Sequence, residues 1–391
     1  MDTRTWLAPL LALLLVGPLE AQVELLVTSR FTDQVLSYDG ASGAFLGVFC
    51  QGGGLDNPVG LTFGPDGNLY VASGDTDEVL RYDGTTGAFI DVFAAGGGLD
   101  GPRQVNFGPD GHLYVASGAT DEVLRYDGTS GAFLGVFASG GNLNGPTSFA
   151  FGPSGALYVG SVLNDRIKSY DGQSGAFLGN FASQGLNGPH DLAFGPDGNL
   201  YVSNAFSARI RRYDGVTGAL RDTFIDDPAL SGALGLCWDE RGRLYVVNQG
   251  RNEVRRYNAF GRFLGSLVAT GSGGLSAPLF AVFRPAVHEL RVAGPLPGVP
   301  GVTNWVALDG ARPGGRLELR IGNRPVLRRR PGCSLAAHEL LPFFRVPLVA
   351  DESGRALFAS AGALDVLGSS VFLQGLEEDS CATSPVLPFR F

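Results

Sequence analysis

Two adjacent stretches of this chain, residues 59–102 and 103–146, are 44 residues long each and nearly identical, and the stretches that follow repeat the theme with growing divergence. Each unit holds four strand-length runs, the second of which reads Asn68-Leu69-Tyr70-Val71-Ala72 in the first unit. The Pro-Asp-Gly at 65–67 suits a tight turn, because Pro presets φ and Gly accepts a positive φ. Four antiparallel strands repeating every 40–45 residues or so predict β-propeller blades.

The two ends of the repeat region predict the number of blades. Residues 24–58 carry only the second, third and fourth strands of a unit, and the missing first strand recurs as the apolar run 278–283. Five complete units and this divided one predict an all-β, six-bladed β-propeller over residues 22–285, closed by strands from its own two ends. Closure removes the exposed sheet edges that an open stack would leave for aggregation.

The blade motif also resembles known families. The run Gly-Pro-Asp-Gly-Asn-Leu-Tyr-Val at 64–71, followed by Glu78-Val79 and by Tyr82-Asp83, resembles the NHL-repeat family with its streptogramin-lyase-like and gluconolactonase-like (SMP-30-like) relatives. The resemblance covers about residues 24–284. It implies the propeller fold, but those families share blades across enzymes, receptors and scaffolds, so it does not select an activity.

The segments outside the repeats predict export and a second domain. Residues 1–21 read as a signal peptide with an apolar core from Leu7 to Val16, too short to span a bilayer, so we expect a secreted protein without membrane insertion. Residues 286–301 are rich in Pro and Gly and read as a linker. Short alternating runs over 302–391 predict a small β-sandwich-like domain, which resembles a C-terminal module of secreted bacterial proteins.

Charge restricts the partners. The chain has a formal net charge of −9, and the excess of acidic residues lies in the propeller stretch 22–285. A nucleic-acid-binding protein needs a basic surface, so we expect no nucleic-acid partner. A protein or a glycan is the expected partner, and we expect a monomer.

The four cysteines allow three pairings. Cys50 falls on the outermost strand of one blade and Cys237 on the innermost strand of another, so a blade's width should keep them beyond the reach of a disulfide. Cys333 and Cys381 share the small C-terminal domain and are the expected bridge. Closing that loop would stabilise the domain by about 4 kcal/mol in the chain-entropy model.

The starts of the innermost strands are the strongest candidate site. They should lie near one mouth of the central channel, where propellers bind ligands. A polar ligand site there would be made by Arg103, Gln104, Ser148, His190 and Asp191, with Asn204 and Asn248 from second strands. The structural alternative is that these residues cap strands and face solvent.

No catalytic motif accompanies this set. The sequence contains no HExxH, Gly-x-Ser-x-Gly, P-loop or Cys-x-x-Cys. The gluconolactonase-like relatives bind a divalent metal through an Asn-Gly and an Asp, but the matching places here hold His190-Asp191 and Asn204, and the relatives' Glu ligand has no match. The resemblance therefore implies that this ligand set is mostly absent and that no cofactor is required, while a different divalent-metal site stays open.

Two recurrent features have structural interpretations. The acids of Thr76-Asp77-Glu78 and of 120–122 occur once per blade, so turn chemistry explains them better than calcium, which needs six to eight oxygens around one point. The recurrent tyrosines, such as Tyr70 and Tyr114, fit packing between blades better than a row for stacking sugars.

Two function classes remain open. The preferred one is an extracellular, non-catalytic binding or scaffold propeller that presents a face to a protein or glycan partner. Near-identical blades at 59–102 and 103–146 favour it, because an enzyme site normally needs distinct residues from distinct blades. The alternative is a metal-dependent, lactonase-like lyase or hydrolase at the channel mouth around His190 and Asp191.

Overall fold

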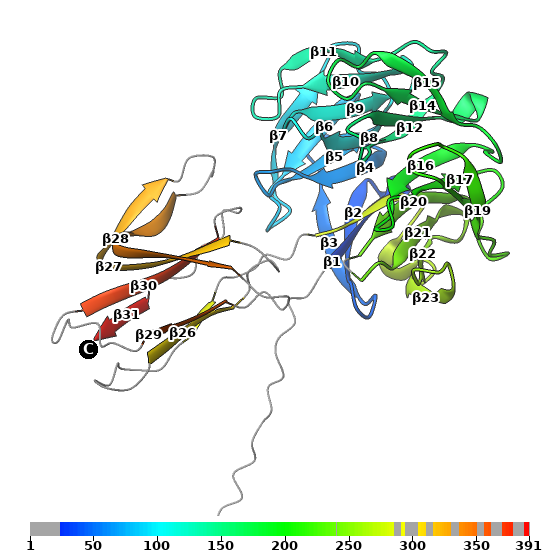
Figure 1. The fold of residues 1–391 in the computed structure, drawn as a ribbon. Helices are drawn as coiled ribbons and strands as arrows, with labels where there is room; N and C mark the ends of the chain where they lie inside the picture. The colour runs from blue at the N-terminus through cyan, green and yellow to red at the C-terminus, as the bar shows by residue number, and fades with distance from the viewer. Residues whose placement is uncertain are drawn as a thin grey trace, which may run out of the picture.

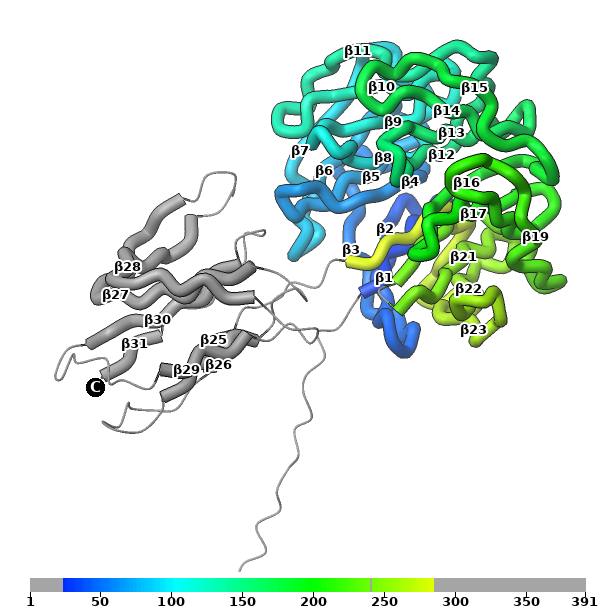
Figure 2. Tube along the Cα trace, in the orientation of Figure 1, coloured from blue at the N-terminus to red at the C-terminus, as the bar shows by residue number. Residues whose placement is uncertain are grey.

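Six four-stranded antiparallel sheets follow one another around a ring in the computed structural model of this chain (Figure 1). The structure describes residues 24–284 except residue 240, and, further along, the backbone of seven strands between Arg291 and Arg390. In Figure 2 the chain passes around the ring from blue through green to yellow and returns beside its blue start. The prediction of an all-β six-bladed propeller is confirmed.

The sheets are numbered here as blades 1 to 6, each given from the innermost to the outermost strand. Blade 1 contains β24 (Pro278–Phe283), β1 (Glu24–Ser29), β2 (Gln34–Asp39) and β3 (Phe45–Gln51). Blade 2 contains β4 (Pro58–Phe63), β5 (Leu69–Ser73), β6 (Glu78–Tyr82) and β7 (Phe89–Ala95). Blade 3 contains β8 (Pro102–Phe107), β9 (Leu113–Ser117), β10 (Glu122–Tyr126) and β11 (Phe133–Ala138).

The second half of the ring repeats this order. Blade 4 contains β12 (Pro146–Phe151), β13 (Leu157–Ser161), β14 (Arg166–Tyr170) and β15 (Phe177–Ala182). Blade 5 contains β16 (Pro189–Phe194), β17 (Leu200–Asn204), β18 (Arg209–Tyr213) and β19 (Leu220–Ile225). Blade 6 contains β20 (Ala233–Trp238), β21 (Leu244–Asn248), β22 (Glu253–Tyr257) and β23 (Phe263–Val268). Four short 3₁₀ turns accompany these strands: η1 (Arg30–Thr32), η2 (Val162–Asn164), η3 (Gln249–Arg251) and η4 (Ser272–Gly274).

Blade 1 closes the ring as the sequence predicted. Strand β24 pairs antiparallel with β1, and Leu25 lies opposite Phe283. The Thr28 hydroxyl lies 3.0 Å from the Phe280 backbone N–H that donates to it. At the end of the pair, Arg284 forms an ion pair with Glu24 at 3.2 Å. Hydrogen bonds, apolar contacts and a charge pair therefore join segments about 250 residues apart in the chain.

The core lies between neighbouring blades, and the recurrent tyrosines fill it. Tyr70 is 1% exposed and meets Phe93 of its own blade and Phe107 of the next blade edge-to-face, with ring centroids 4.8 and 4.9 Å apart. Tyr114 makes the same pair of contacts one blade further on. Edge-to-face aromatic pairs add about 0.5–1.5 kcal/mol each beyond burial of their area. The prediction of interblade packing is confirmed.

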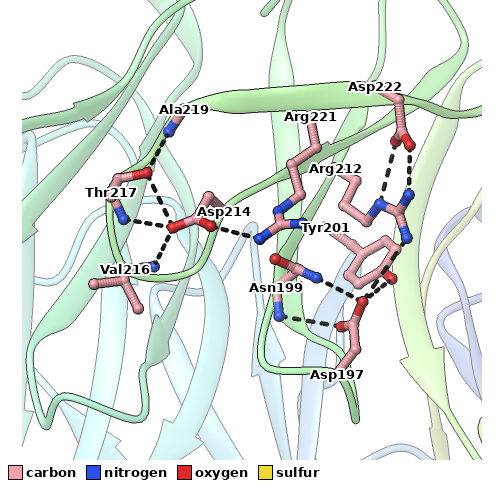
Figure 3. A network of polar contacts seen from close by, with 10 residues as sticks. All are labelled: Asp197, Asn199, Tyr201, Arg212, Asp214, Val216, Thr217, Ala219, Arg221 and Asp222. Carbon is pink, nitrogen blue, oxygen red and sulfur yellow. Dashed lines mark hydrogen bonds and ion pairs between the residues drawn. The ribbon is translucent and has the colours of Figure 1, made fainter.

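In blades 2, 3 and 5 a turn aspartate and a third-strand arginine tie the blade together at one end of the ring. In blade 5, the Tyr201 hydroxyl donates to the Asp197 carboxylate at 3.0 Å, and Arg212 pairs with both Asp197 and Asp222 (Figure 3). In the following turn, Asp214 accepts from backbone N–H groups and pairs with Arg221 at 2.6 Å. These acids therefore hold the turns and edges of the blade, and their role is structural.

Bulges interrupt the outermost strands. In blade 1 the register between β2 and β3 shifts twice, once between Val35 and Leu36 and once between Ser37 and Tyr38. Gly47 lies opposite Ser37, between the two shifts. Gly47 has φ 148°, a conformation that side chains disfavour. Bulges twist an edge away from further pairing, so the exposed rim is protected although Leu46 and Val48 remain 48% and 42% exposed.

The C-terminal strands form two separate sheets. One has the order β25-β26-β29, with bounds Arg291–Ala293, Asn304–Asp309 and Ala356–Ser360. The other has the order β28-β27-β30-β31, with bounds Ala336–Val349, Arg316–Arg329, Ser370–Glu377 and Leu387–Arg390. β25 falls within the stretch predicted as a linker. The sandwich-like domain over 302–391 stays a prediction, and the predicted signal peptide at 1–21 lies outside the described residues.

Candidate functional site

Loops between the second and third strands gather around the starts of the innermost strands at one end of the ring. We call this surface the hairpin face and define it by its six loops, at residues 29–33, 73–77, 117–121, 161–165, 204–208 and 248–252. An acid in each of four loops joins neighbouring blades. Asp77, in the left-handed conformation at φ 58°, accepts from the Gly101 N–H at 2.8 Å, and Asp121 accepts from Gly145 in the same way. Asp77 and Asp121 therefore lie in turns, as expected, but their carboxylates hold the next blade and not their own turn.

Asn204 and Asn248 lie under this face and are fully buried. Asn204 accepts from the Asn187 N–H at 2.7 Å, and Asn248 accepts from the Ser231 N–H at 2.7 Å. In blade 2 the Ser73 hydroxyl accepts from the Asp56 N–H, which is also 17 residues earlier in the chain. Both amides thus hold the loop that leads into their own blade, and the structure does not bring them into the mouth.

Gln104 and Asp191 lie at equivalent positions and reach to the next blade. Gln104 accepts from the backbone N–H of Phe149 in blade 4. The Asp191 carboxylate accepts from the Leu236 N–H of blade 6 at 2.7 Å and from the Leu192 N–H at 2.8 Å. Where blade 2 has Gly60 instead, a Cβ atom would lie 2.5 Å from the Arg103 carbonyl oxygen. This position is therefore a junction between blades.

Burial changes the acidity of Asp191. The side chain is 2% exposed, and desolvation raises its pKa to about 7 although the hydrogen bonds from Leu236 and Leu192 favour the ionised form. The Ser148 hydroxyl is fully buried and has no hydrogen bond of good geometry among the described residues, but it lies close enough to Asp191 to oppose the rise of that pKa. Asp191 and Ser148 therefore form a buried polar pair beneath the mouth.

Three side chains from alternate blades meet at the mouth itself. The His190 ring of blade 5 lies against the Phe280 ring of blade 1, with centroids 5.6 Å apart and planes inclined by 36°. Arg103 of blade 3 is half-buried and near enough to His190 to affect its charge. Burial, reinforced by Arg103, lowers the pKa of His190 to about 4, so the imidazole is neutral at physiological pH. Its Nδ1 atom is buried and has no partner among the described residues.

Large apolar side chains stand on the hairpin face around this mouth. Phe31, Leu163 and Phe206 occupy the same position in the loops of blades 1, 4 and 5, and they are 72%, 68% and 72% exposed. The other blades have Asp75, Ala119 or Gly250 there. Sequence reasoning about the mouth missed these three residues and Phe280, although a comparison of the six loops would have found large apolar residues where the near-identical blades have Asp75 and Ala119.

The described part of the chain offers little for a metal or a disulfide. Over residues 24–284 without residue 240, no group of three or more His, Cys, Asp or Glu is arranged to hold a metal ion. Cys50 and Cys237 are both free thiols, as expected from their separate blades. The predicted bridge between Cys333 and Cys381 lies outside the described residues. No helix within the described residues is both long and apolar enough to cross a bilayer.

Comparison with known proteins supports the fold. No protein-family model and no curated protein matches this sequence. A nidogen–laminin complex structure is similar with a TM-score of 0.57 at 14% identity, covering 68% of this chain and 99% of that chain. A streptogramin B lyase is similar with a TM-score of 0.52 at 16% identity, covering 66% and 82%.

A third similar structure, of a protein of unknown function from Bacteroides caccae, has a TM-score of 0.53 at 12% identity and covers 66% of this chain and 98% of that chain. At these identities the likeness extends to the six-bladed fold only. The neighbours differ in function, so the fold is shared between a lyase and proteins of other kinds.

Proposed function

We propose that this chain is a secreted, monomeric, non-catalytic binding protein of the NHL-like propeller group, and that its hairpin face docks a protein partner. The observation that carries the proposal is the set of exposed apolar side chains around the mouth, Phe31, Leu163 and Phe206. Aromatic and aliphatic anchors surrounded by polar loops are the usual energetic centre of a protein interface. A glycan would make less use of Leu163, so a protein is the favoured partner.

The contacts of the mouth residues support a binding role over a catalytic one. Gln104 and Asp191 use their side-chain oxygens to accept hydrogen bonds from the next blade, so their acceptor capacity is largely committed. Asn204 and Asn248 are committed in the same way to their own loops. A nidogen–laminin complex among the similar structures supports protein recognition by this fold as a class.

Site-specific photo-crosslinking tests the docking face. A photo-reactive benzoylphenylalanine replaces Phe206 on the hairpin face or, as a matched control, Phe260, which is 88% exposed in a turn at the opposite end of its blade. In extracellular medium of the source cells, we expect one recurrent protein adduct from position 206 and none from position 260. Excess wild-type chain should suppress the adduct, whereas the variant carrying Phe31→Ser, Leu163→Ser and Phe206→Ser should not. Equal adducts from both positions would contradict the proposal.

A metal-dependent, lactonase-like lyase or hydrolase is the second candidate. His190 favours it, because a neutral imidazole with an unpartnered nitrogen beside the buried Asp191 resembles an acid–base pair. Metal analysis and turnover assays with lactones and a streptogramin separate the two functions. A stoichiometric divalent ion, lost together with turnover in His190→Ala, would establish the enzyme and overturn the binding proposal.

A further inference from the structure

Arg103 is a half-buried cation without a partner. Among the described residues no carboxylate lies within 4.0 Å of its guanidinium, and none accepts a hydrogen bond from it. Arg241, Arg251 and Arg262 also have no protein partner among the described residues, but they are exposed. The half-buried Arg166 and Arg256 have no carboxylate partner either, but each donates to a backbone carbonyl oxygen. The half-buried Arg81 and Arg212, by contrast, each pair with carboxylates of their own blade. Partial burial of a cation costs free energy unless an anion compensates, so Arg103 is set up to receive one.

A second guanidinium faces the same region. Arg30 of blade 1 is held by the Asn57 side-chain oxygen. Burial, reinforced by the charge of Arg30, lowers the pKa of Arg103. Asp75 partly offsets this repulsion, but its carboxylate is engaged by the Asn57 amide at 2.7 Å. The propeller is acidic overall, yet this part of the mouth is locally positive. A bound anion between the two arginines would relieve their repulsion.

His190 supplies the third polar contact. Its Nδ1 is buried and unpartnered among the described residues, and its ring is fixed against Phe280. A neutral imidazole carries one N–H and one bare nitrogen. Because Nδ1 is buried, an anion at the mouth that also contacts Arg103 would meet the other ring nitrogen, Nε2. An anion at this point would favour the protonated imidazole and raise the pKa of His190. The pKa of His190 therefore reports whether an anion is bound at this site.

We propose that Arg103, assisted by Arg30 and His190, is the anchor for a glutamate or aspartate carboxylate of the partner protein. This inference rests on the proposed docking of a protein on the hairpin face. A guanidinium takes a carboxylate in a bidentate, charge-assisted pair, which gives direction as well as affinity. Phe31, adjacent to Arg30 and 72% exposed, provides an apolar surface beside the anchor. The recognised segment thus combines an acidic residue with a neighbouring apolar side chain.

Histidine NMR of the full-length chain tests the anchor directly. The probes are the peptides acetyl-Phe-Glu-amide and acetyl-Phe-Gln-amide, which differ only in the carboxylate, and the His190 signals are assigned with His190→Gln. We expect a saturable shift and a raised His190 pKa with the Glu peptide, and about ten- to hundredfold weaker binding of the Gln peptide, the range that one charge-assisted pair provides. Arg103→Met should weaken the Glu peptide by the same factor.

Matched controls separate the anchor from general electrostatics and from misfolding. Arg251→Met removes an equal charge from an exposed position on the same face and should leave binding unchanged. In ligand-free Arg103→Met the pKa of His190 should rise from about 4, which verifies both folding and the proximity of the two side chains. Equal binding of both peptides, no shift with either peptide, or equal loss in the two arginine variants would overturn the anchor.

Two further comparisons identify the source of the anion and show whether the docking face or the Arg103 anchor is wrong. Tighter binding of glucuronate or of inorganic phosphate than of the Glu peptide would overturn the assignment to a protein carboxylate. If crosslinking from position 206 succeeds and persists in Arg103→Met, the docking face stands and the anchor is wrong. If the Glu peptide binds through Arg103 but no adduct forms at position 206, the anchor stands and the docking proposal fails.

Discussion

Asp191 should make the stability of the propeller depend on pH in an unusual direction. Burial raises its pKa from 3.8 to about 7, a shift of about 3 units. Each unit corresponds to about 1.36 kcal/mol, so the linkage amounts to about 4 kcal/mol. Because the folded pKa lies above the unfolded one, the folded state binds the proton more tightly. The contribution is fully present below the unfolded pKa, declines as pH rises between the two values, and is lost above about pH 7.

Urea unfolding of the full-length chain and of Asp191→Asn between pH 4 and pH 8 measures this term. All 11 tyrosines lie within the propeller, so the tyrosine contribution to the near-UV circular dichroism reports on the unfolding of the propeller. The unfolding free energy of wild type minus that of the variant should fall by about 4 kcal/mol across this range. His190 titrates in both proteins with a lowered pKa, so its opposite contribution largely cancels in the difference.

A second variant provides the control. Hydrogen bonds from Ser174 and Gln173 lower the pKa of the exposed turn residue Asp171 below its ordinary value of 3.8, so its contribution is complete above about pH 4 and the same difference for Asp171→Asn should stay nearly flat between pH 4 and pH 8. A constant or rising difference for Asp191→Asn would refute the reasoning, because it would mean that burial of Asp191 does not favour its neutral form.

Three further substitutions test ring closure, blade spacing and a buried charge pair, each by urea unfolding of the full-length chain. Phe280→Ala removes a ring that is 5% exposed and should cost about 3–5 kcal/mol, whereas the 88% exposed Phe260→Ala should cost less than about 0.5; similar losses would contradict the closing role of β24. Gly60→Ala places a Cβ 2.5 Å from a backbone oxygen of the next blade and should cost about 1–3 kcal/mol, while Gly160→Ala, with no contact closer than 3.5 Å, should be near neutral. The Arg255 guanidinium lies 2.9 Å from the Asp227 carboxylate and 3.1 Å from the Glu253 carboxylate. Arg255→Met leaves both carboxylates without their cation and should cost about 3–5 kcal/mol of unfolding free energy; a more stable variant would show that these ion pairs do not stabilise the blade.

The fold could be predicted from the sequence because the information repeats. Each blade restates the same turn and strand pattern, and the apolar run at 278–283 has a clear counterpart at 189–194. Local chemistry also predicted that Asp77 and Asp121 lie in turns, where both have a positive φ, but not that their carboxylates bond to the next blade. Structural features that depend on the local sequence pattern could therefore be predicted from the sequence.

The mouth could not be predicted to the same depth. Gln104 and Asp191 bond to backbone N–H groups about 45 residues away, and a backbone donor leaves no trace in the side-chain pattern. The contact of His190 with Phe280 depends on how blades 5 and 1 face each other across the axis. Residue type suggested polar groups at the mouth, but only geometry separated the committed acceptors from the unpartnered Arg103 and the His190 Nδ1 atom.

The pairing of β24 with β1 also governs the order in which the chain can mature. During synthesis β1 is made first, yet its inner edge has no partner until residues 278–283 have left the ribosome. Until then five complete blades can stack only as an open arc, with one bare strand edge and one uncovered blade surface. The last step of folding is thus a docking event between the oldest and the newest parts of the repeat region, and a nascent chain halted before residue 278 should remain dependent on chaperones.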